Sequence, residues 1–370
     1  MLTKKIRKLP LALRAKIFPE GRNYVPSLKT PVSNFLVHTK RHCNGGRTVD
    51  AGLWLKKHCD KGGKIFFAMA GAGSSFEIGV SLSEMIRAGK IGAISVTGAN
   101  LEESLYRYLS NKDYAYIPHY DELTRQEEKT FDRVGLRRIT TTFLPEEETV
   151  RKVLNHFLKL WREAEKTGKY LLWHEYFFEL FRRKLVKPGR PEDVKNCWLY
   201  QAWLHNIPIF VPGVEDSTMG NIFGYFSYDG VHPFLKKYKQ KNPISVNVIG
   251  HSFRYMHRLA EWYMDNTKKK GLAFLELGGG ISGDFPICVV PHLKKDYLDG
   301  HSIKIQEKLI RAWSGFIAIC SSPMSYGSYS GAGYKEKITW SKFEIDAFGC
   351  VIHGDYTAHA PDIFALVLGK

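Results

Sequence analysis

Short apolar runs alternate with amphipathic segments along the chain. Residues 64–70 (KIFFAMA) form a continuous apolar run bounded by glycines, which is typical of a strand buried on both faces of a parallel sheet. Val80, Leu82 and Ile86 then recur at helical spacing, and residues 91–96 are again strand-like. Two successive strand–turn–helix units predict an α/β fold with a doubly wound, mainly parallel, Rossmann-like sheet and helices on both faces.

The same reasoning extends to the rest of the chain. It predicts strands at 207–212, 272–277, 316–320 and 350–353, and helices at 48–59, 191–205, 251–266 and 360–368. Residues 1–45 are rich in proline and basic residues without a clear period, which predicts a basic N-terminal arm of irregular structure. Residues 110–190 are more charged and more helical, with helices expected from Pro145 and from Tyr170.

Glycine-rich turns follow the first two predicted strands. The first is Gly71-Ala72-Gly73-Ser74-Ser75, and the second is Thr97-Gly98-Ala99-Asn100. We expect Asn100 to be the N-cap of the next helix, with Glu102 and Glu103 in its first turn. A strand, a glycine-rich turn and a helix in this order direct backbone N–H groups toward an anion. Because GAGSS does not match GxGxxG, an ordinary tight turn is the alternative for the first of them.

Two later predicted strands also end in residues that suit a ligand site. Gly278-Gly279-Gly280 follows the strand at 272–277, and Glu215 and Asp216 lie just past the strand at 207–212. Side chains and glycines at the carboxyl ends of parallel strands lie where α/β proteins bind their ligands. These turns therefore predict one ligand site along one edge of the sheet.

The stretch from 325 to 342 (SYGSYSGAGYKEKITWSK) combines a pliable Gly/Ser loop with Glu336, Trp340 and Lys342. A carboxylate can pair with a cation, an indole ring can face that cation, and a desolvated lysine can form a Schiff base. The stretch is thus a candidate amine-handling site. On composition alone, a polar surface loop followed by a strand is the alternative.

Charge and cysteine content narrow the classes of function. The formal net charge is +17, but the basic residues fall in separate clusters such as Arg182–Lys184 and Lys268–Lys270, and no nucleic-acid-binding signature accompanies them. Nucleic acid is therefore not expected as the main partner. The six cysteines form no CxxC pair and are interpreted as reduced core residues of a cytoplasmic protein without a metal site. We expect no secretory signal and no membrane span.

Several of these motifs, taken in order, resemble the deoxyhypusine synthase family. The matching segments are Thr97–Asn100 with the following acidic pair, the block from 203 to 222, Leu277–Gly280, Ser330-Gly331-Ala332 with Glu336 and Trp340-Ser341-Lys342, and the final Gly354-Asp355. The resemblance covers residues 46–370 and implies a single NAD-binding domain with a helical insertion at about 110–190. It also implies that Lys342 carries a 4-aminobutyl group as an imine, assisted by Glu336.

The resemblance carries the family's NAD contacts onto this chain one residue at a time. The implied cofactor-binding residues are Ala72, Gly73, Ser74, Thr97, Gly98, Glu103, Asp216, Gly279, Gly280 and Asp355. The implied substrate-binding residues are Trp340, Asn221, Asp284, Tyr329 and Ser330. About twenty residues near 294–313 are an insertion relative to the family.

The substrate side departs from the family pattern. Asn221 replaces an aspartate that binds the polyamine, Asp284 replaces a histidine, and Tyr326 and Tyr329 replace two further aspartates. Since a buried ammonium requires a counter-charge, the loss of carboxylates predicts an altered amine substrate, shorter or less charged than spermidine.

Three functions follow from these observations. The first is an NAD-dependent transferase that passes an aminobutyl group to a protein lysine or, as in homospermidine synthesis, to a free diamine. The second is another NAD-dependent enzyme on this scaffold, and the third is a catalytically inactive regulatory member. The resemblance also implies a homotetramer, built as a dimer of dimers with the site at a dimer interface.

Overall fold

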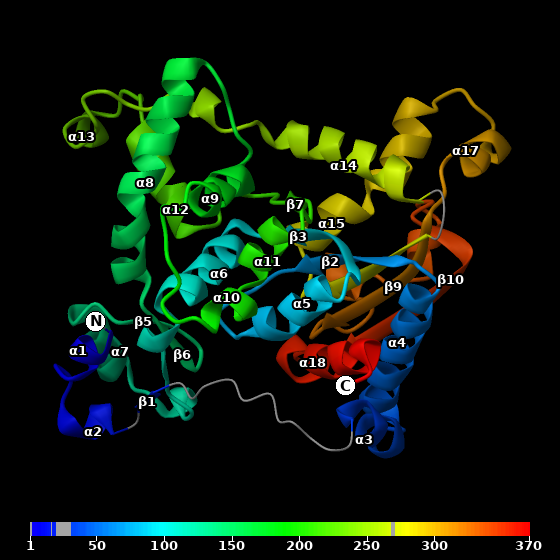
Figure 1. The fold of residues 1–370 in the computed structure, drawn as a ribbon, viewed down its shortest axis with the longest axis horizontal. Coiled ribbons are helices and arrows are strands. Elements are labelled where there is room, and N and C mark those ends of the chain that lie inside the picture. Colours follow the sequence, from blue (N-terminus) through cyan, green and yellow to red (C-terminus); the bar gives the residue numbers. More distant parts are fainter. Residues whose placement is uncertain (1, 16, 20–30, 268–270) are drawn as a thin grey trace.

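The computed structural model describes residues 2–15, 17–19, 31–267 and 271–370, so the Lys268–Lys270 cluster lies outside the described residues. A six-stranded, wholly parallel sheet lies at its centre (Figure 1). In spatial order its strands are β10 (Phe343–His353), β9 (Trp313–Cys320), β8 (Leu272–Leu277), β2 (Lys64–Met69), β3 (Ile91–Val96) and β7 (Ile209–Phe210). The predicted α/β fold is confirmed, although β10 is longer and β7 shorter than expected.

Helices cover both faces of this sheet (Figure 1). On one face, Phe67 of β2 packs against Phe364, and on the other face Phe66 packs against Trp262. Side chains of a strand point alternately to its two faces, so neighbouring phenylalanines anchor opposite layers. The first layer holds α4 (Cys43–Asp60), α5 (Ile78–Arg87) and α18 (Tyr356–Leu368), and the second holds α14 (Ser252–Thr267) and α15 (Ile281–Ile287).

The strand order reverses between β2 and β8. From β2 the chain adds β3 and then β7 on one side, and it returns to place β8, β9 and β10 on the other side. The turns that follow β2 and β8 therefore flank a topological switch point, where open α/β sheets bind ligands. Gly278 lies close to this seam, since a Cβ there would come within 3.3 Å of the Cβ of Ala70.

The segment expected to be helical carries a second, small sheet as well. Strands β1 (Phe18–Pro19), β4 (Ala115–Tyr116), β6 (Thr142–Leu144) and β5 (Arg137–Ile139) pair antiparallel in that order. The helices within residues 110–190 are α7 (Arg125–Arg133), α8 (Glu146–Thr167) and α9 (Trp173–Arg182); α6 (Gly98–Ser110) precedes them, and α10 (Asp193–Asn196) and α11 (Trp198–Leu204) follow. The helices expected from Pro145 and from Tyr170 are confirmed as α8 and α9, whereas the small sheet was not predicted, because strands of two or three residues leave no readable period.

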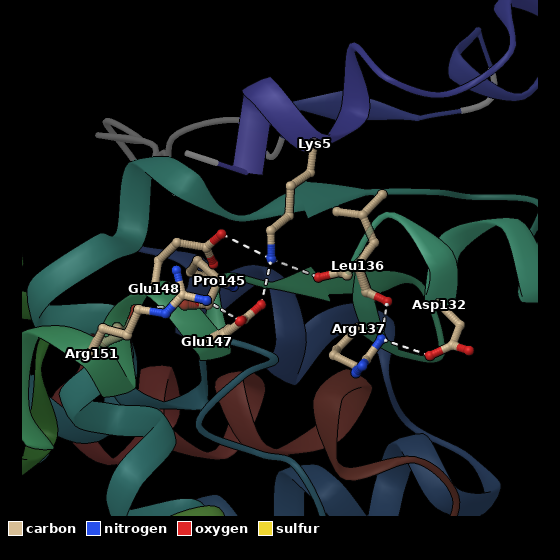
Figure 2. A network of polar contacts seen from close by, with 10 residues as sticks. Lys5, Asp132, Leu136, Arg137, Pro145, Glu147, Glu148 and Arg151 are labelled. Atoms are coloured by element: carbon tan, nitrogen blue, oxygen red, sulfur yellow. Dashed lines mark hydrogen bonds and ion pairs between the residues drawn. The ribbon is translucent and has the colours of Figure 1, made fainter.

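The described part of the N-terminal arm is helical rather than irregular, with α1 (Leu2–Ile6), α2 (Leu11–Arg14) and α3 (Val32–Thr39); residues 20–30 lie outside the described residues. Lys5 anchors α1 on the small sheet (Figure 2). Its ammonium donates to the Gly135 carbonyl at 2.7 Å and pairs with Glu147 at 3.1 Å and Glu148 at 2.9 Å. Leu9 and Leu13 are buried beneath it in the same apolar cluster as Phe143.

The chain between α15 and β9 forms α16 (Val289–Pro291), a π-helical turn (His292–Tyr297) and α17 (Ile303–Leu309). The insertion expected near 294–313 covers most of this turn and all of α17, and that it is an insertion stays a prediction. Elsewhere, α12 (Thr218–Ser227) and α13 (Pro233–Lys236) follow β7. None of the helices in the described part of the chain is long and apolar enough to cross a membrane.

The cysteines are free, but they do not all belong to the core. Four of them are buried, whereas Cys43 is exposed at the start of α4 and Cys288 is partly exposed. The expectation of core cysteines was therefore wrong for Cys43, which opens its helix with a positive φ of 51° instead of packing inside.

His174 of α9 is buried, and its Nδ1 lies 2.9 Å from the Tyr255 hydroxyl. Burial lowers the pKa of His174 to about 4. The unfolded chain binds this proton near pH 6.5 and the folded chain does not, so the folded state loses stability as the pH falls from 6.5 to 4. We expect His174→Gln to reduce the loss of unfolding free energy between pH 7 and pH 4 by about 3 kcal/mol, measured by urea unfolding.

The matched control for this prediction is His119→Gln, because the His119 side chain is largely exposed. In this control, the unfolding free energy is expected to fall between pH 7 and pH 4 by as much as it does in the parent. If both variants show the same change of unfolding free energy with pH as the parent, the folded chain binds the His174 proton as readily as the unfolded chain does. The argument from burial would then be wrong.

Candidate active site

Residues 321–342 form the crossover from β9 to β10. Parallel strands require such a connection, and here it contains short 3₁₀ turns but no α-helix. Its last residue, Lys342, is fixed at the backbone: the Lys342 N–H donates to the Lys337 carbonyl at 3.2 Å, and the Lys342 carbonyl accepts from the Trp313 N–H at 3.1 Å. Lys342 thus lies at the start of β9 and β10, held between the loop and the sheet.

Lys342 is 8% exposed, and its side chain opens onto a cavity of about 560 Å³ between α14, α15 and the crossover. Its Nζ lies 3.6 Å from Asp284 Oδ1, and Trp340 lines the same cavity with 60% of its side chain exposed. The structure therefore brings together three of the predicted site residues. The remaining wall is largely apolar and comes from Met256, Leu259, Phe285, Cys288, Val289 and Pro291.

The π-helical turn at His292–Tyr297 supplies the rest of this wall through His292, Lys295 and Asp296. His292 Nδ1 lies 2.6 Å from Asp296 Oδ2, and Lys295 Nζ lies 6.0 Å from the centre of the Trp340 ring. These residues were not predicted as site residues. Sequence alone does not reveal which face of an inserted segment turns inward.

A buried polar cluster lies behind Lys342 and was missed from the sequence. Glu276 of β8 accepts a hydrogen bond from the Tyr329 hydroxyl at 3.2 Å, and Lys337 Nζ lies 4.4 Å from the centre of the Tyr329 ring. Burial raises the pKa of Glu276 to about 8 and lowers the pKa of Lys337, while the charge of each group opposes the shift of the other. The one available signal was a single carboxylate in the otherwise apolar run LAFLEL.

The other predicted substrate residues lie apart from the cavity wall. Glu336 is exposed on the outer side of the crossover. Asn221 is exposed on α12, where its amide donates to the Ser217 carbonyl at 2.7 Å. Ser330 packs against the glycine turn, since its Oγ donates to the Gly278 carbonyl at 3.3 Å. Their contact with a substrate stays a prediction.

The predicted cofactor residues follow the carboxyl ends of β2, β3, β7, β8 and β10. Thr97, not Asn100, is the N-cap of α6, because its Oγ1 accepts the Asn100 N–H. The helix therefore starts earlier than predicted, and Glu102 falls beyond its first turn. Glu102 instead accepts from the N–H groups of Thr218 and Met219 at 2.8 Å each, which caps α12.

The first glycine-rich turn is tied to α6 by buried hydrogen bonds. The Ser74 N–H donates to Asn100 Oδ1 at 3.0 Å, and the Ser75 N–H donates to Glu103 Oε2 at 3.1 Å. Burial raises the pKa of Glu103 to about 7, an effect that the hydrogen bonds from Ser75 oppose. Glu103 and Ser74 are thus bonded to protein groups, and a role for them at a cofactor stays a prediction.

Gly98 is needed for close packing at the second turn. A Cβ at this position would lie 2.8 Å from the Val214 carbonyl oxygen, which is backbone and cannot rotate away. We expect Gly98→Ala to lower the unfolding free energy by about 1–3 kcal/mol in urea titrations without added ligand.

Gly224→Ala on exposed α12 is the matched control for Gly98→Ala. A Cβ there would meet no atom within 4 Å, so this variant is expected to be neutral or stabilising by at most about 1 kcal/mol. Equal stability of the two variants would mean that the loop after β7 does not press on Gly98.

The outer rim of these turns offers groups suited to a dinucleotide. Asp216 and Asp355 are exposed just past β7 and β10. Asp355 Oδ1 accepts the Thr357 N–H at 2.8 Å and so caps α18, while its other oxygen and the Asp216 carboxylate can accept hydrogen bonds from ribose hydroxyls. A Cβ at Gly280 would meet no atom within 4 Å, so there is open space beside the turn after β8, whereas Gly279 abuts Ser330 Oγ. Toward the interior, Gly73 abuts Met69, and Ala72 is partly exposed.

Comparison with known proteins shows the family of this chain. The family model described as deoxyhypusine synthase matches residues 42–367. The chain is similar to a probable deoxyhypusine synthase 2 of Methanosarcina acetivorans, at 24% identity over 83% of this chain and 77% of that protein. It is also similar to a probable deoxyhypusine synthase of Methanocaldococcus jannaschii, at 24% identity over 85% of each chain.

Proposed function

Because the chain belongs to the deoxyhypusine synthase family, we propose that it transfers a 4-aminobutyl group from a polyamine donor to an amine acceptor through an imine on Lys342, with NAD as cofactor. The observation that carries this proposal is the position of Lys342, which is almost buried yet opens onto a cavity lined by Asp284 and Trp340. A lysine in such a place is shielded from bulk water and can reach a small amine.

The residues of the cavity have separate roles in this proposal. Lys342 must be neutral to attack, and Asp284 at 3.6 Å is placed to take its proton. The Lys342 amine then adds to the carbon of the oxidised donor, the departing amine leaves with a proton, and the imine to Lys342 remains. Attack by the acceptor amine reverses these steps and frees Lys342. The exposed ring of Trp340 would lie along the carbon chain of the fragment.

The rim formed by Asp216, Gly280 and Asp355 fits a dinucleotide and would hold NAD. When bound, NAD would accept a hydride from the donor carbon and return it to the product. The acceptor amine belongs to a protein lysine or to a free diamine. A homotetramer in the cytoplasm is part of the same proposal and can be tested by light scattering and by cell fractionation.

An imine trap tests this function. The full-length protein is incubated with NAD or NADP and a panel of diamines and polyamines, then reduced with cyanoborohydride and mapped by peptide mass spectrometry. A four-carbon amine adduct on Lys342 that requires NAD is expected. Bound NAD without an adduct from any amine would contradict the transfer and favour another oxidoreductase or a regulatory subunit.

A further inference from the structure

Glu276 is an unusual residue for the middle of a parallel sheet. It is 1% exposed and lies in register with Ala68 on β2 and Ala318 on β9, whose small side chains leave room beside it. One carboxyl oxygen accepts from Tyr329, and the other has no hydrogen-bond partner in the described part of the chain. A fully buried carboxyl group is costly unless the surrounding structure compensates for it.

Lys337 is the cationic counterpart on the crossover. Its side chain is 3% exposed, and its Nζ lies 4.4 Å from the centre of the Tyr329 ring and 5.5 Å from that of Phe316. Aromatic faces attract a desolvated ammonium, and the charges of Lys337 and Glu276 each oppose the pKa shift that burial imposes on the other. Neither Glu276 nor Lys337 is part of the cavity wall, so neither contacts a substrate there.

This pair touches both supports of the candidate active site. Glu276 abuts α15 at Gly283, where a Cβ would lie 2.3 Å from the unbonded carboxyl oxygen, and the next residue along α15 is Asp284. On the other side, the Lys337 carbonyl accepts the Lys342 N–H at 3.2 Å. The pair therefore lies between the element that carries Asp284 and the loop that carries Lys342.

We propose that Glu276 and Lys337 form a charge-compensated positioning pair that holds the Lys342 loop against α15 and so sets the contact between Lys342 and Asp284. The proposal rests on the proposed function in giving Lys342 a reactive role. Removing one member of the pair withdraws the charge that offsets the burial of the other, and the loop must shift to bring water to the buried ionisable group that is left. Removing both leaves no such group.

A double-mutant cycle in the full-length protein tests this pair. The variants are Glu276→Gln, which keeps the shape and an acceptor for Tyr329, Lys337→Met, which keeps the volume, and the two combined. The first readout is hydrogen exchange of amides 336–343 without substrates. We expect each single variant to speed this exchange at least about 10-fold and the double variant to stay within about 3-fold of the parent.

The second readout is the rate of the trapped Lys342 adduct. Each single variant is expected to slow adduct formation at least about 10-fold, and the double variant is expected to form the adduct within about 3-fold of the parent rate. The half-saturating amine concentration should stay unchanged in all three variants, because the cavity wall is intact. Lys335→Met, an exposed neighbour in the same loop, is the matched control and should match the parent in both readouts.

The proposal would be overturned if the effects of the two single variants on exchange or on the adduct rate added up in the double variant. It would also be overturned if the single variants exchanged amides 336–343 as slowly as the parent. If a single variant fails to fold, the double variant decides the matter, since it should fold and form the adduct at nearly the parent rate. The two proposals fail separately: a parent protein that forms no adduct contradicts the transferase function, whereas the exchange cycle still tests the pair.

Discussion

Replacing Lys342 with alanine is expected to abolish the trapped adduct and to slow aminobutyl transfer by at least about 10³-fold. Lys342 provides the amine next to Asp284 in the cavity, and alanine leaves no nucleophile at that place. The affinity for NAD should change by less than about 3-fold, because Lys342 is not one of the residues proposed to hold NAD, which are Asp216, Gly280 and Asp355.

This prediction is checked by transfer assays with a labelled polyamine, the mass of the reduced protein, and calorimetric titration with NAD. Lys335→Ala is the control, because Lys335 is an exposed lysine of the same loop that lies outside the cavity wall. Transfer that persists in the Lys342 variant would show that another group attacks the oxidised donor.

The second large effect concerns stability. Trp313 is fully buried at the start of β9, where it packs on Phe66, Tyr263 and Phe274 and its indole N–H donates to the Ile287 carbonyl at 3.2 Å. Trp313→Ala should lower the unfolding free energy by about 3–5 kcal/mol, because it removes a large apolar side chain and leaves a cavity among rigid rings. Urea or thermal unfolding measures the change.

Trp340→Ala provides the matched control, since the Trp340 side chain is 60% exposed in the cavity. We expect it to change the unfolding free energy by less than about 1 kcal/mol while it weakens amine binding. Similar losses of stability in the two variants would mean that the indole of Trp340 packs as tightly as that of Trp313.

The core strands could be predicted because each is an apolar run of suitable length bounded by turn residues. Residues 64–69 and 91–96 are the clearest examples, since burial on both faces leaves a strand few polar positions. The start of α6 was misjudged because Thr97 and Asn100 are both good N-caps, and only the hydrogen bond between them shows that Thr97 has this role.

The candidate site was only partly predictable. Lys342 and Trp340 stood out because their chemistry is unusual in a Gly/Ser loop, and Asp284 was singled out through the family resemblance. Lys337 could not be recognised, because a lysine two positions from exposed Lys335 gives no sign of burial. Its burial depends on Tyr329, Phe316 and Glu276, which come from three places in the sequence and meet only in the folded sheet.

The position of β2 in the sheet bears on how the protein reaches its native state. One edge of β2 pairs with the neighbouring β3, but its other edge pairs with β8, and Lys64 faces Leu272 across that ladder. During synthesis this edge of β2 stays unpaired until β8, at residues 272–277, has been made. The surface of α4 that packs against α18 likewise stays uncovered until the last residues of the chain have been made. We therefore expect slow folding dominated by contacts of long sequence separation, and aggregation of nascent or truncated chains that lack β8, because an uncovered apolar strand edge recruits other strands.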